Sequence, residues 1–221
     1  VDKFDIKNYI IDDETVRKII PKRYSDSNKG SYGKLLLLTG SRGMTGAGCL
    51  AGKAALRSGL GLLYLGVPAS LTNVYDSILI ESVTLPLEDD DTGYITKGCI
   101  ESLKEYMAGV DVIALGPGLS TKGDVGDVVF SIVENSKVPL VIDADGINVI
   151  SKNIEVLKKS NVPVVLTPHP GEMARLLGTS PEEVQKNRIN VARDFSRKWN
   201  VITVLKGSRT IVALPDGSIY I

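Results

Sequence analysis

Short apolar runs alternate along the chain with longer stretches in which apolar residues recur every three or four positions. Most of the short runs are continuously apolar, which is typical of strands covered on both faces of a sheet. We therefore expect strands over Lys34–Leu38, Leu62–Val67, Asp111–Leu115, Leu140–Ile142, Val164–Leu166 and Val201–Leu205. The helical spacing predicts helices over Ala47–Ser58, Lys97–Met107, Asp124–Asn135, Ile154–Lys159, Glu172–Leu177 and Pro181–Trp199.

The clearest helical signal is the last one. Ser180 is suited to cap the helix, Pro181 to occupy its first position and Glu183 to complete a capping box. After this helix, residues 209–221 (RTIVALPDGSIYI) alternate around a Pro-Asp-Gly turn and predict an antiparallel hairpin. The repeated strand–helix order predicts an α/β fold, with a doubly wound, mostly parallel sheet and helices on both faces. Without a linker or repeat, residues 1–221 are expected to form one domain.

Composition narrows the function classes. Lys and Arg number 26, as do Asp and Glu, so the chain lacks the basic excess expected of a nucleic-acid-binding protein. It contains neither a signal sequence nor an apolar stretch near the ~20 residues of a membrane span, so no membrane partner is expected. Cys49 and Cys99 lie far apart and His169 is the single histidine, which argues against a zinc site or a disulfide framework. These features favour the cytoplasm.

Candidate chemistry gathers after the predicted strands, where ligands bind in open α/β sheets. Residues 39–61 (TGSRGMTGAGCLAGKAALRSGLG) form a glycine-rich connection that either suits a phosphate at the next helix or is only a tight turn. Residues 116–118 (Gly-Pro-Gly) must also turn, with or without a ligand against them. Asp143 and Asp145 either cap a helix or hold Mg²⁺. Lys206 either meets a phosphate or extends to water.

His169 lies between two prolines, at the end of an apolar run and directly before a helix, in the stretch VVLTPHPGEMARLLG. Taken alone, it is most simply a polar residue at a strand end. Alternatively, a charged imidazole would counter a phosphate, or a neutral one would bond a ribose or an amide. The number of polar or glycine-rich strand ends favours a nucleotide-type ligand.

Several segments, in order, resemble the NAD(P)H-hydrate dehydratase family. They are YGKLLLLTGSRGMTGAGCLAGKAALRSGLGLLYLGVP, ALGPGLS, PLVIDADGIN, VVLTPHPGEMARLLG and VLKGSRTIVALPDG, and they extend from about Ser31 to Ile221. This carbohydrate-kinase-like domain is often fused to an NAD(P)HX epimerase domain. The resemblance implies a ribokinase-like fold. It also implies ADP- or ATP-dependent dehydration of the 6S hydrate of NADH or NADPH (NAD(P)HX), with Mg²⁺ as cofactor and a homotetramer as the assembly.

Carried over to this sequence, the family pattern makes Ala47, Gly118 and His169 substrate contacts. It makes Lys206, Gly207, Ser208, Arg209 and Thr210 the nucleotide-binding run, whereas Asp143 and Asp145 are weaker candidates for a metal. The implied mechanism is transfer of a phosphoryl group to the ring hydroxyl, followed by elimination of phosphate.

The sequence departs from the family in one respect. The family continues into an Asn-x-x-Gly…Gly-Ser-Gly-Asp-Val-Leu-Thr-Gly segment, whose Asp is the expected base, whereas this sequence ends at Ile221 and begins with Val. We therefore expect residues 1–221 to lack the C-terminal segment of the domain and to be inactive alone. Two alternatives stay open: a small-molecule kinase of the same fold, for instance one acting on a vitamin precursor, or a non-catalytic nucleotide-binding remnant.

Overall fold

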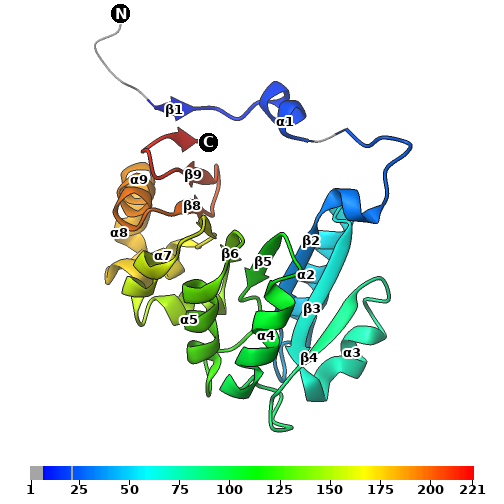
Figure 1. Cartoon of the computed structure of the whole chain (residues 1–221). Coiled ribbons are helices and arrows are strands. Elements are labelled where there is room, and N and C mark those ends of the chain that lie inside the picture. Colours follow the sequence, from blue (N-terminus) through cyan, green and yellow to red (C-terminus); the bar gives the residue numbers. More distant parts are fainter. Residues whose placement is uncertain (1–6, 21) are drawn as a thin grey trace, which may run out of the picture. The chain divides into compact units, whose positions relative to one another are not determined.

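The computed structural model describes residues 7–20 and 22–221, and its contacts divide the chain into two compact units. The central unit comprises residues 28–164, and the terminal unit combines residues 1–27 with residues 165–221. Figure 1 shows the helices and strands of both units, coloured along the sequence from blue to red. The prediction of one domain over residues 1–221 stays a prediction.

The central unit contains a parallel sheet in the order β6-β5-β2-β3-β4. Its strands are β2 (Lys34–Leu38), β3 (Leu62–Pro68), β4 (Val83–Leu87), β5 (Val112–Leu115) and β6 (Leu140–Ile142). The sequence pattern missed β4, which has the sequence VTLPL. A proline is unusual within a sheet but is tolerated in an edge strand, and β4 pairs with β3 alone.

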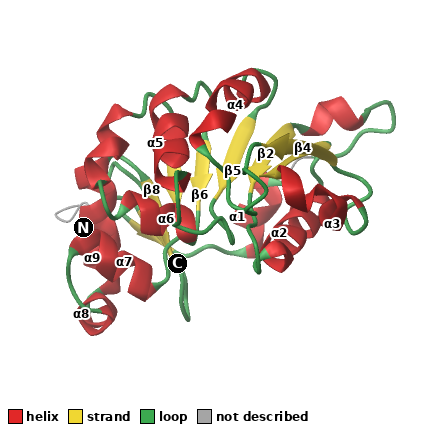
Figure 2. Ribbon diagram, turned by 90° about the horizontal axis from the view of Figure 1, so that it is seen from below, coloured by secondary structure: helices red, strands yellow, loops and turns green. Residues whose placement is uncertain are grey.

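Helices cover both faces of this sheet. They are α2 (Thr45–Arg57), α3 (Thr72–Asp76), α4 (Ile100–Met107), α5 (Val125–Asn135) and α6 (Asp145–Ile150), with 3-10 turns at Lys29–Tyr32, Ala69–Leu71, Lys97–Cys99 and Ile154–Lys159. Figure 2 shows α4 and α5 on one face of the strands and α2 and α3 on the other. Because helices lie on both faces, the expected doubly wound arrangement is confirmed. The helix expected at Ile154–Lys159 is present as a 3-10 helix.

The terminal unit contains strands β1 (Asn8–Tyr9), β8 (Ile202–Leu205), β9 (Ile211–Ala213) and β10 (Ile219–Tyr220), and β7 (Val164–Leu166) begins at its boundary. The strand order is β7-β8-β9-β10-β1. β7 and β8 are parallel, whereas β9 is antiparallel to both β8 and β10, which confirms the predicted hairpin. Its helices are α1 (Asp13–Ile19), α7 (Pro170–Leu177), α8 (Pro181–Lys186) and α9 (Arg188–Trp199).

The prediction of one helix over Pro181–Trp199 is wrong. Ser180 caps α8 as expected, because its hydroxyl accepts the N–H of Glu183 at 3.3 Å. The helix ends at Asn187, however, whose φ of −144° and ψ of 49° lie outside the helical region. Arg188 then starts α9, and its side chain bonds the loop after β8. The apolar spacing continues across the break, which explains why the pattern did not reveal it.

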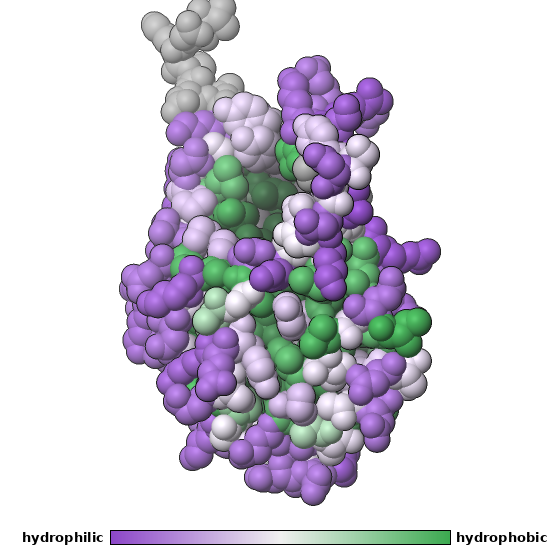
Figure 3. Space-filling view, turned by 45° about the vertical axis from the view of Figure 1, so that its right-hand side comes forward, coloured by the Kyte–Doolittle hydropathy of each residue, from purple (hydrophilic) through white to green (hydrophobic). Residues whose placement is uncertain are grey.

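The strands supply much of the apolar core in both units. Leu36, Leu65 and Ile113 are fully buried in the central unit, and Leu205 and Ile219 in the terminal unit. Hydrophobic side chains also reach the surface, where Figure 3 shows them as green patches among hydrophilic residues. Within the described residues, no helix combines the length and apolar character that a membrane crossing requires.

Candidate functional site

The glycine-rich loop after β2 is bonded to the Gly-Pro-Gly turn after β5. The N–H of Gly40 donates to the carbonyl of Pro117 at 3.0 Å, and the buried hydroxyl of Ser41 donates to the carbonyl of Gly118 at 2.9 Å. A Cβ added to Gly118 would lie 2.8 Å from the Cβ of Ala47. The structure thus brings together Ala47 and Gly118, two of the predicted substrate contacts.

Part of the glycine content of this loop is explained by packing. Tyr75 of α3 is fully buried beneath it, and a Cβ at Gly40 would lie 1.7 Å from the tyrosine oxygen. A Cβ at Gly48 would lie 2.8 Å from the same ring. The Tyr75 hydroxyl has no hydrogen-bond partner among the described residues, and burial raises its pKa well above the ordinary value. These two glycines therefore make room for a protein side chain.

Asp143 and Asp145 follow β6, on either side of Ala144, which has a φ of +49°. One carboxylate oxygen of Asp145 accepts the N–H of Ser120 at 2.9 Å, and the other accepts the side-chain amide of Asn148 at 3.2 Å. Asp145 therefore bonds both the chain after the Gly-Pro-Gly turn and its own helix. The described residues contain no group of three or more His, Cys, Asp or Glu side chains that would hold a metal. A metal role for either aspartate stays a prediction without geometric support.

His169 is the N-cap of α7. Its Nδ1 accepts the N–H groups of Gly171 at 3.0 Å and Glu172 at 3.3 Å. In return, Oε2 of Glu172 accepts the N–H of His169 at 2.7 Å, which completes a capping box. Pro170 occupies the first helical position, where its missing N–H costs nothing. The imidazole is half-exposed, as a ligand contact must be.

Glu172 also faces the loop after β8. Only 4% of the residue is exposed, and its Oε2 lies 4.0 Å from Nζ of Lys206. The N–H of Lys206 donates to the carbonyl of Pro168 at 2.9 Å, so the segments that carry His169 and Lys206 are bonded through their backbones as well. Within the terminal unit, the predicted substrate histidine and the start of the predicted nucleotide run are therefore neighbours.

The loop at residues 206–210 is held by Arg188. Its guanidinium donates to the carbonyls of Ser208 at 2.7 Å, Leu205 at 3.1 Å and Lys206 at 3.4 Å. Gly207 suits this position, because its φ of +153° is rarely adopted by other residues and a Cβ would lie 2.7 Å from Nη2 of Arg188. At the end of the run, the hydroxyl of Thr210 donates to the carbonyl of Gly207 at 3.1 Å.

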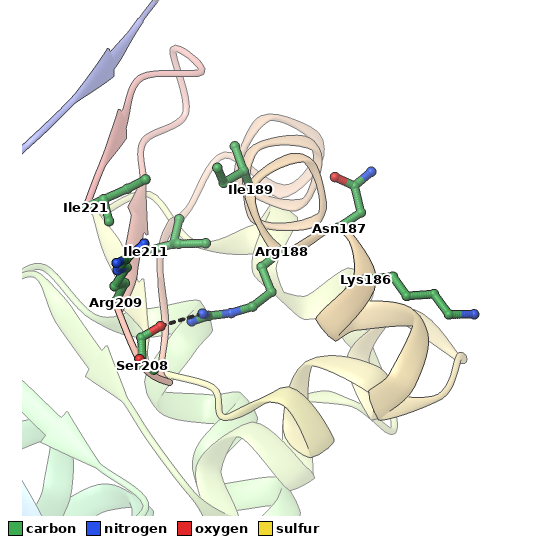
Figure 4. A pocket seen from close by; sticks show the side chains of 8 residues that line it. All are labelled: Lys186, Asn187, Arg188, Ile189, Ser208, Arg209, Ile211 and Ile221. Atoms are coloured by element: carbon green, nitrogen blue, oxygen red, sulfur yellow. Dashed lines mark hydrogen bonds between the residues drawn. The ribbon is translucent and has the colours of Figure 1, made fainter.

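A cavity of about 350 Å³ adjoins this loop. Figure 4 shows the side chain of Arg188 reaching from the start of α9 toward Ser208, with Ile189 and Ile211 nearby. The lining residues are Lys186, Asn187, Arg188, Ile189, Ser208, Arg209, Ile211 and Ile221. The cavity thus combines apolar branched side chains with cationic ones.

Sequence reasoning placed the predicted site residues on loops and helix starts but missed two side chains that organise them. Glu172 is the first residue of a predicted helix, and a Glu three residues after a cap is a recognisable capping-box signal. Arg188 carried no signal, because its partners lie 17 to 20 residues further along the chain. The burial of Tyr75 under the glycine-rich loop could not be predicted either, since it depends on the packing of α3 under a distant loop.

The order of strands and helices is similar to that of a solved structure with a ribokinase-like fold. A ribokinase-like superfamily protein from Enterococcus faecalis V583 superimposes with a TM-score of 0.79 at 22% identity, covering 100% of this chain and 73% of the other. At this identity the likeness concerns the fold alone, and it confirms the expected ribokinase-like fold.

The family follows from closer comparisons. Residues 35–221 match the model of the NAD(P)H-hydrate dehydratase family, and the chain belongs to that family. The bifunctional NAD(P)H-hydrate repair enzyme of Moorella thermoacetica is 40% identical over 93% of this chain and 39% of its own length. The chain spans about two fifths of the length of such bifunctional relatives.

Shorter relatives are covered more fully. The ADP-dependent (S)-NAD(P)H-hydrate dehydratase of Bacillus subtilis is 34% identical over 95% of this chain and 70% of its own length. A crystal structure of the ADP/ATP-dependent NAD(P)H-hydrate dehydratase from Bacillus subtilis, co-crystallised with ATP and Mg²⁺, has a TM-score of 0.74 and 32% identity. That match covers 94% of this chain and 69% of the other.

Proposed function

We propose that this chain serves the ADP- or ATP-dependent dehydration of (6S)-NAD(P)H hydrate back to NAD(P)H. The family match over residues 35–221 carries the proposal. The geometry supports it through the terminal unit, where a half-exposed imidazole at a helix start neighbours a cationic loop beside a cavity. Neighbouring sites for a polar substrate and an anionic nucleotide are what such a reaction requires.

The proposed chemistry proceeds in two steps. The hydroxyl oxygen of the hydrated ring attacks the terminal phosphorus of the nucleotide and loses its proton to solvent. The bond from that phosphorus to the bridging oxygen breaks, and the shortened nucleotide leaves with the electron pair. The ring C–O bond then breaks as phosphate leaves with its electron pair, and the neighbouring ring carbon releases a proton to restore the double bond. Transfer of this kind depends mainly on positioning and electrostatics.

We propose Ala47, Gly118 and His169 as substrate contacts, each for its own reason. Gly118 is buried directly beside the partly exposed Ala47, so the substrate is proposed to lie against Ala47 and the turn that carries Gly118. His169 offers a half-exposed ring whose orientation is set by the helix start. The base that takes the ring proton is not assigned among the described residues.

The nucleotide is proposed to bind along Lys206, Gly207, Ser208, Arg209 and Thr210. Exposed backbone in this run, together with the cations of Lys206 and Arg209, suits the anionic phosphates. The adjoining cavity supplies Ile189, Ile211 and Ile221, and these apolar side chains suit a flat base. The Bacillus subtilis relative crystallised with ATP and Mg²⁺ supports the nucleotide assignment.

We propose that Mg²⁺ binds together with the nucleotide. Among the described residues, no group of three or more His, Cys, Asp or Glu side chains gathers to hold the ion, and Asp145 is bonded to Ser120 and Asn148. Phosphate oxygens are the ligands that Mg²⁺ prefers, so we propose that the nucleotide brings the ion. No step of the reaction is assigned to a metal held by the protein.

The test is to incubate the protein at its full natural length with chemically prepared NADHX and either ADP or ATP in the presence of Mg²⁺. We expect the absorbance of NADH to return only when nucleotide is present. Binding of nucleotide and of substrate is measured separately by calorimetry, so that binding without turnover can be recognised. Phosphorylation of a small alcohol without recovery of NADH would instead support the kinase, and nucleotide binding without turnover of either substrate would support the remnant.

We also propose a cytoplasmic location and a homo-oligomeric, tetrameric assembly. Pyridine nucleotides are cytoplasmic metabolites, and a repair reaction needs access to them. Size-exclusion chromatography with light scattering tests the assembly, and a monomer at micromolar concentration would contradict it.

A further inference from the structure

The bonds of the His169 ring specify which nitrogen carries its hydrogen. Nδ1 accepts the N–H groups of Gly171 and Glu172, and a nitrogen that accepts two hydrogen bonds carries no hydrogen itself. In the neutral ring the hydrogen must therefore reside on Nε2. His169 presents this N–H from a half-exposed side chain.

Glu172 supports this arrangement from the buried side. Its Oε2 accepts the main-chain N–H of His169 at 2.7 Å, which holds the residue at the start of α7, where the two N–H donors of the helix point at Nδ1. Its Oε1 lies 3.4 Å from Nε2, and a carboxylate at this distance favours a hydrogen on that nitrogen. Only 4% of Glu172 is exposed, so water does not replace these contacts.

We propose that Glu172 is a positioning residue that holds His169 as the Nε2–H tautomer, so that His169 meets its ligand as a hydrogen-bond donor. The ligand atom opposite Nε2 must then be an acceptor, such as a phosphate, ribose or carboxamide oxygen. The ligand class rests on the proposed dehydratase function, whereas the tautomer rests only on the contacts within the terminal unit. Glu172 itself touches neither substrate nor nucleotide in this scheme.

The tautomer can be measured directly, because the chain contains one histidine. Long-range ¹H–¹⁵N spectra of uniformly ¹⁵N-labelled protein in alkaline buffer report which ring nitrogen carries the hydrogen. We expect one set of signals with a protonated Nε2 and an unprotonated Nδ1. A dominant Nδ1–H form in the wild-type chain would overturn the proposal without reference to any activity.

Variants then test the role of Glu172. Glu172→Met keeps the length of this buried side chain but removes its acceptors, and we expect the single Nε2–H pattern to become a mixture of both tautomers. Glu172→Gln keeps an oxygen for the His169 N–H and is expected to retain the wild-type pattern. The matched control is Glu183→Ala, at the equivalent third position of α8, where the side chain is exposed and pairs with Lys186.

A kinetic measurement separates this proposal from the function on which it partly rests. In a chain that dehydrates NADHX, Glu172→Met should raise KM for the hydrate roughly tenfold with a smaller change in kcat, since one oriented hydrogen bond is lost. Glu172→Gln should restore KM to near the wild-type value. Unchanged ring signals and unchanged KM in Glu172→Met would overturn the positioning role. Absence of dehydration by the wild-type protein at its full natural length would instead reject the dehydratase function and leave the NMR result standing.

Discussion

At the scale of single residues, the contact between Gly118 and Ala47 gives the sharpest test of the proposed substrate site. Gly118→Ala places a Cβ 2.8 Å from Ala47 and 2.9 Å from the carbonyl oxygen of Met44 at a φ of +65°. We expect loss of stability of about 1–3 kcal/mol from overpacking, together with at least tenfold weaker binding of NADHX. Calorimetric titration and thermal unfolding measure the two effects.

The control for this variant is Gly123→Ala. Gly123 has a similar φ of +56°, but a Cβ there would have nothing within 4 Å. Backbone strain is thus matched while the steric contact is absent, and the affinity for NADHX should stay near that of the wild type. Equal losses of affinity in both variants would mean that strain, and not the contact with Ala47, explains the effect.

At Tyr75 we expect a substitution to keep or increase the stability of the chain. Its buried hydroxyl lacks a hydrogen-bond partner among the described residues, and an unpaired polar group in the interior is destabilising. Tyr75→Phe should therefore keep or raise the melting temperature at neutral pH. A fall comparable with that of Tyr75→Ala, which serves as a cavity-forming comparison, would show that the hydroxyl is bonded.

The same residue makes stability depend on alkaline pH. Burial raises the pKa of Tyr75 in the folded chain, whereas an exposed tyrosine in the unfolded chain loses its proton above about pH 10. The unfolded state is then favoured as pH rises, so this contribution is absent below pH 10 and destabilises above it. Urea unfolding near pH 8 and above pH 10 should show a smaller decrease for Tyr75→Phe than for the wild type.

At the scale of elements, the start of α9 and the loop after β8 act together. Arg188→Met removes the donors to the carbonyls of Leu205, Lys206 and Ser208, which leaves the loop shape unsupported. We expect the dissociation constant for ATP to rise about tenfold, while binding of NADHX changes less. Calorimetry with each ligand measures the difference.

Arg197→Met provides the comparison on the same helix. Arg197 donates to the carbonyl of Asp216 in the β9–β10 turn, away from residues 206–210. Its loss should leave ATP affinity near the wild-type value. If both arginine variants weaken ATP equally, a general loss of helix packing or of positive charge explains the effect better than the shape of the loop.

At the scale of the whole chain, residues near the N-terminus complete a sheet formed by residues near the C-terminus. β1 pairs with β10, and the N–H of Ile11 donates to the carbonyl of Ile221 at 2.8 Å. Tyr9 stacks on Tyr220 with ring centroids 5.0 Å apart. The terminal unit is therefore assembled from two distant stretches of sequence.

Removal of residues 1–11 should lower the melting temperature by a few degrees, because the edge of β10 loses its hydrogen bonds and its aromatic partner. A chain that lacks only residues 1–6 is the control, and the difference between the two melting temperatures gives the contribution of residues 7–11, which include β1. Differential scanning calorimetry measures both. The same melting temperature in the two truncated chains would show that the pairing of β1 with β10 contributes no measurable stability.

The sequence by itself determined the strands and helices that repeat a local pattern. Continuous apolar runs predicted β2 and β6 at their observed bounds, since burial of a strand on both faces requires apolar residues in succession. The His-Pro-Gly-Glu stretch was equally readable as a strand end followed by a helix, because the apolar run before it and the two prolines beside His169 are local signals. Ordered motifs were sufficient to indicate the family.

Tertiary structure decided what depends on contacts between distant residues. The periodic pattern of the sequence does not show three features. They are the end of α8 at Asn187, the hydrogen bonds from Arg188 to the loop after β8, and the packing of Tyr75 under Gly40. The same holds for the distance between Glu172 and Lys206. Apolar periodicity reports which face of an element is buried, but only the packed chain specifies which side chains meet there.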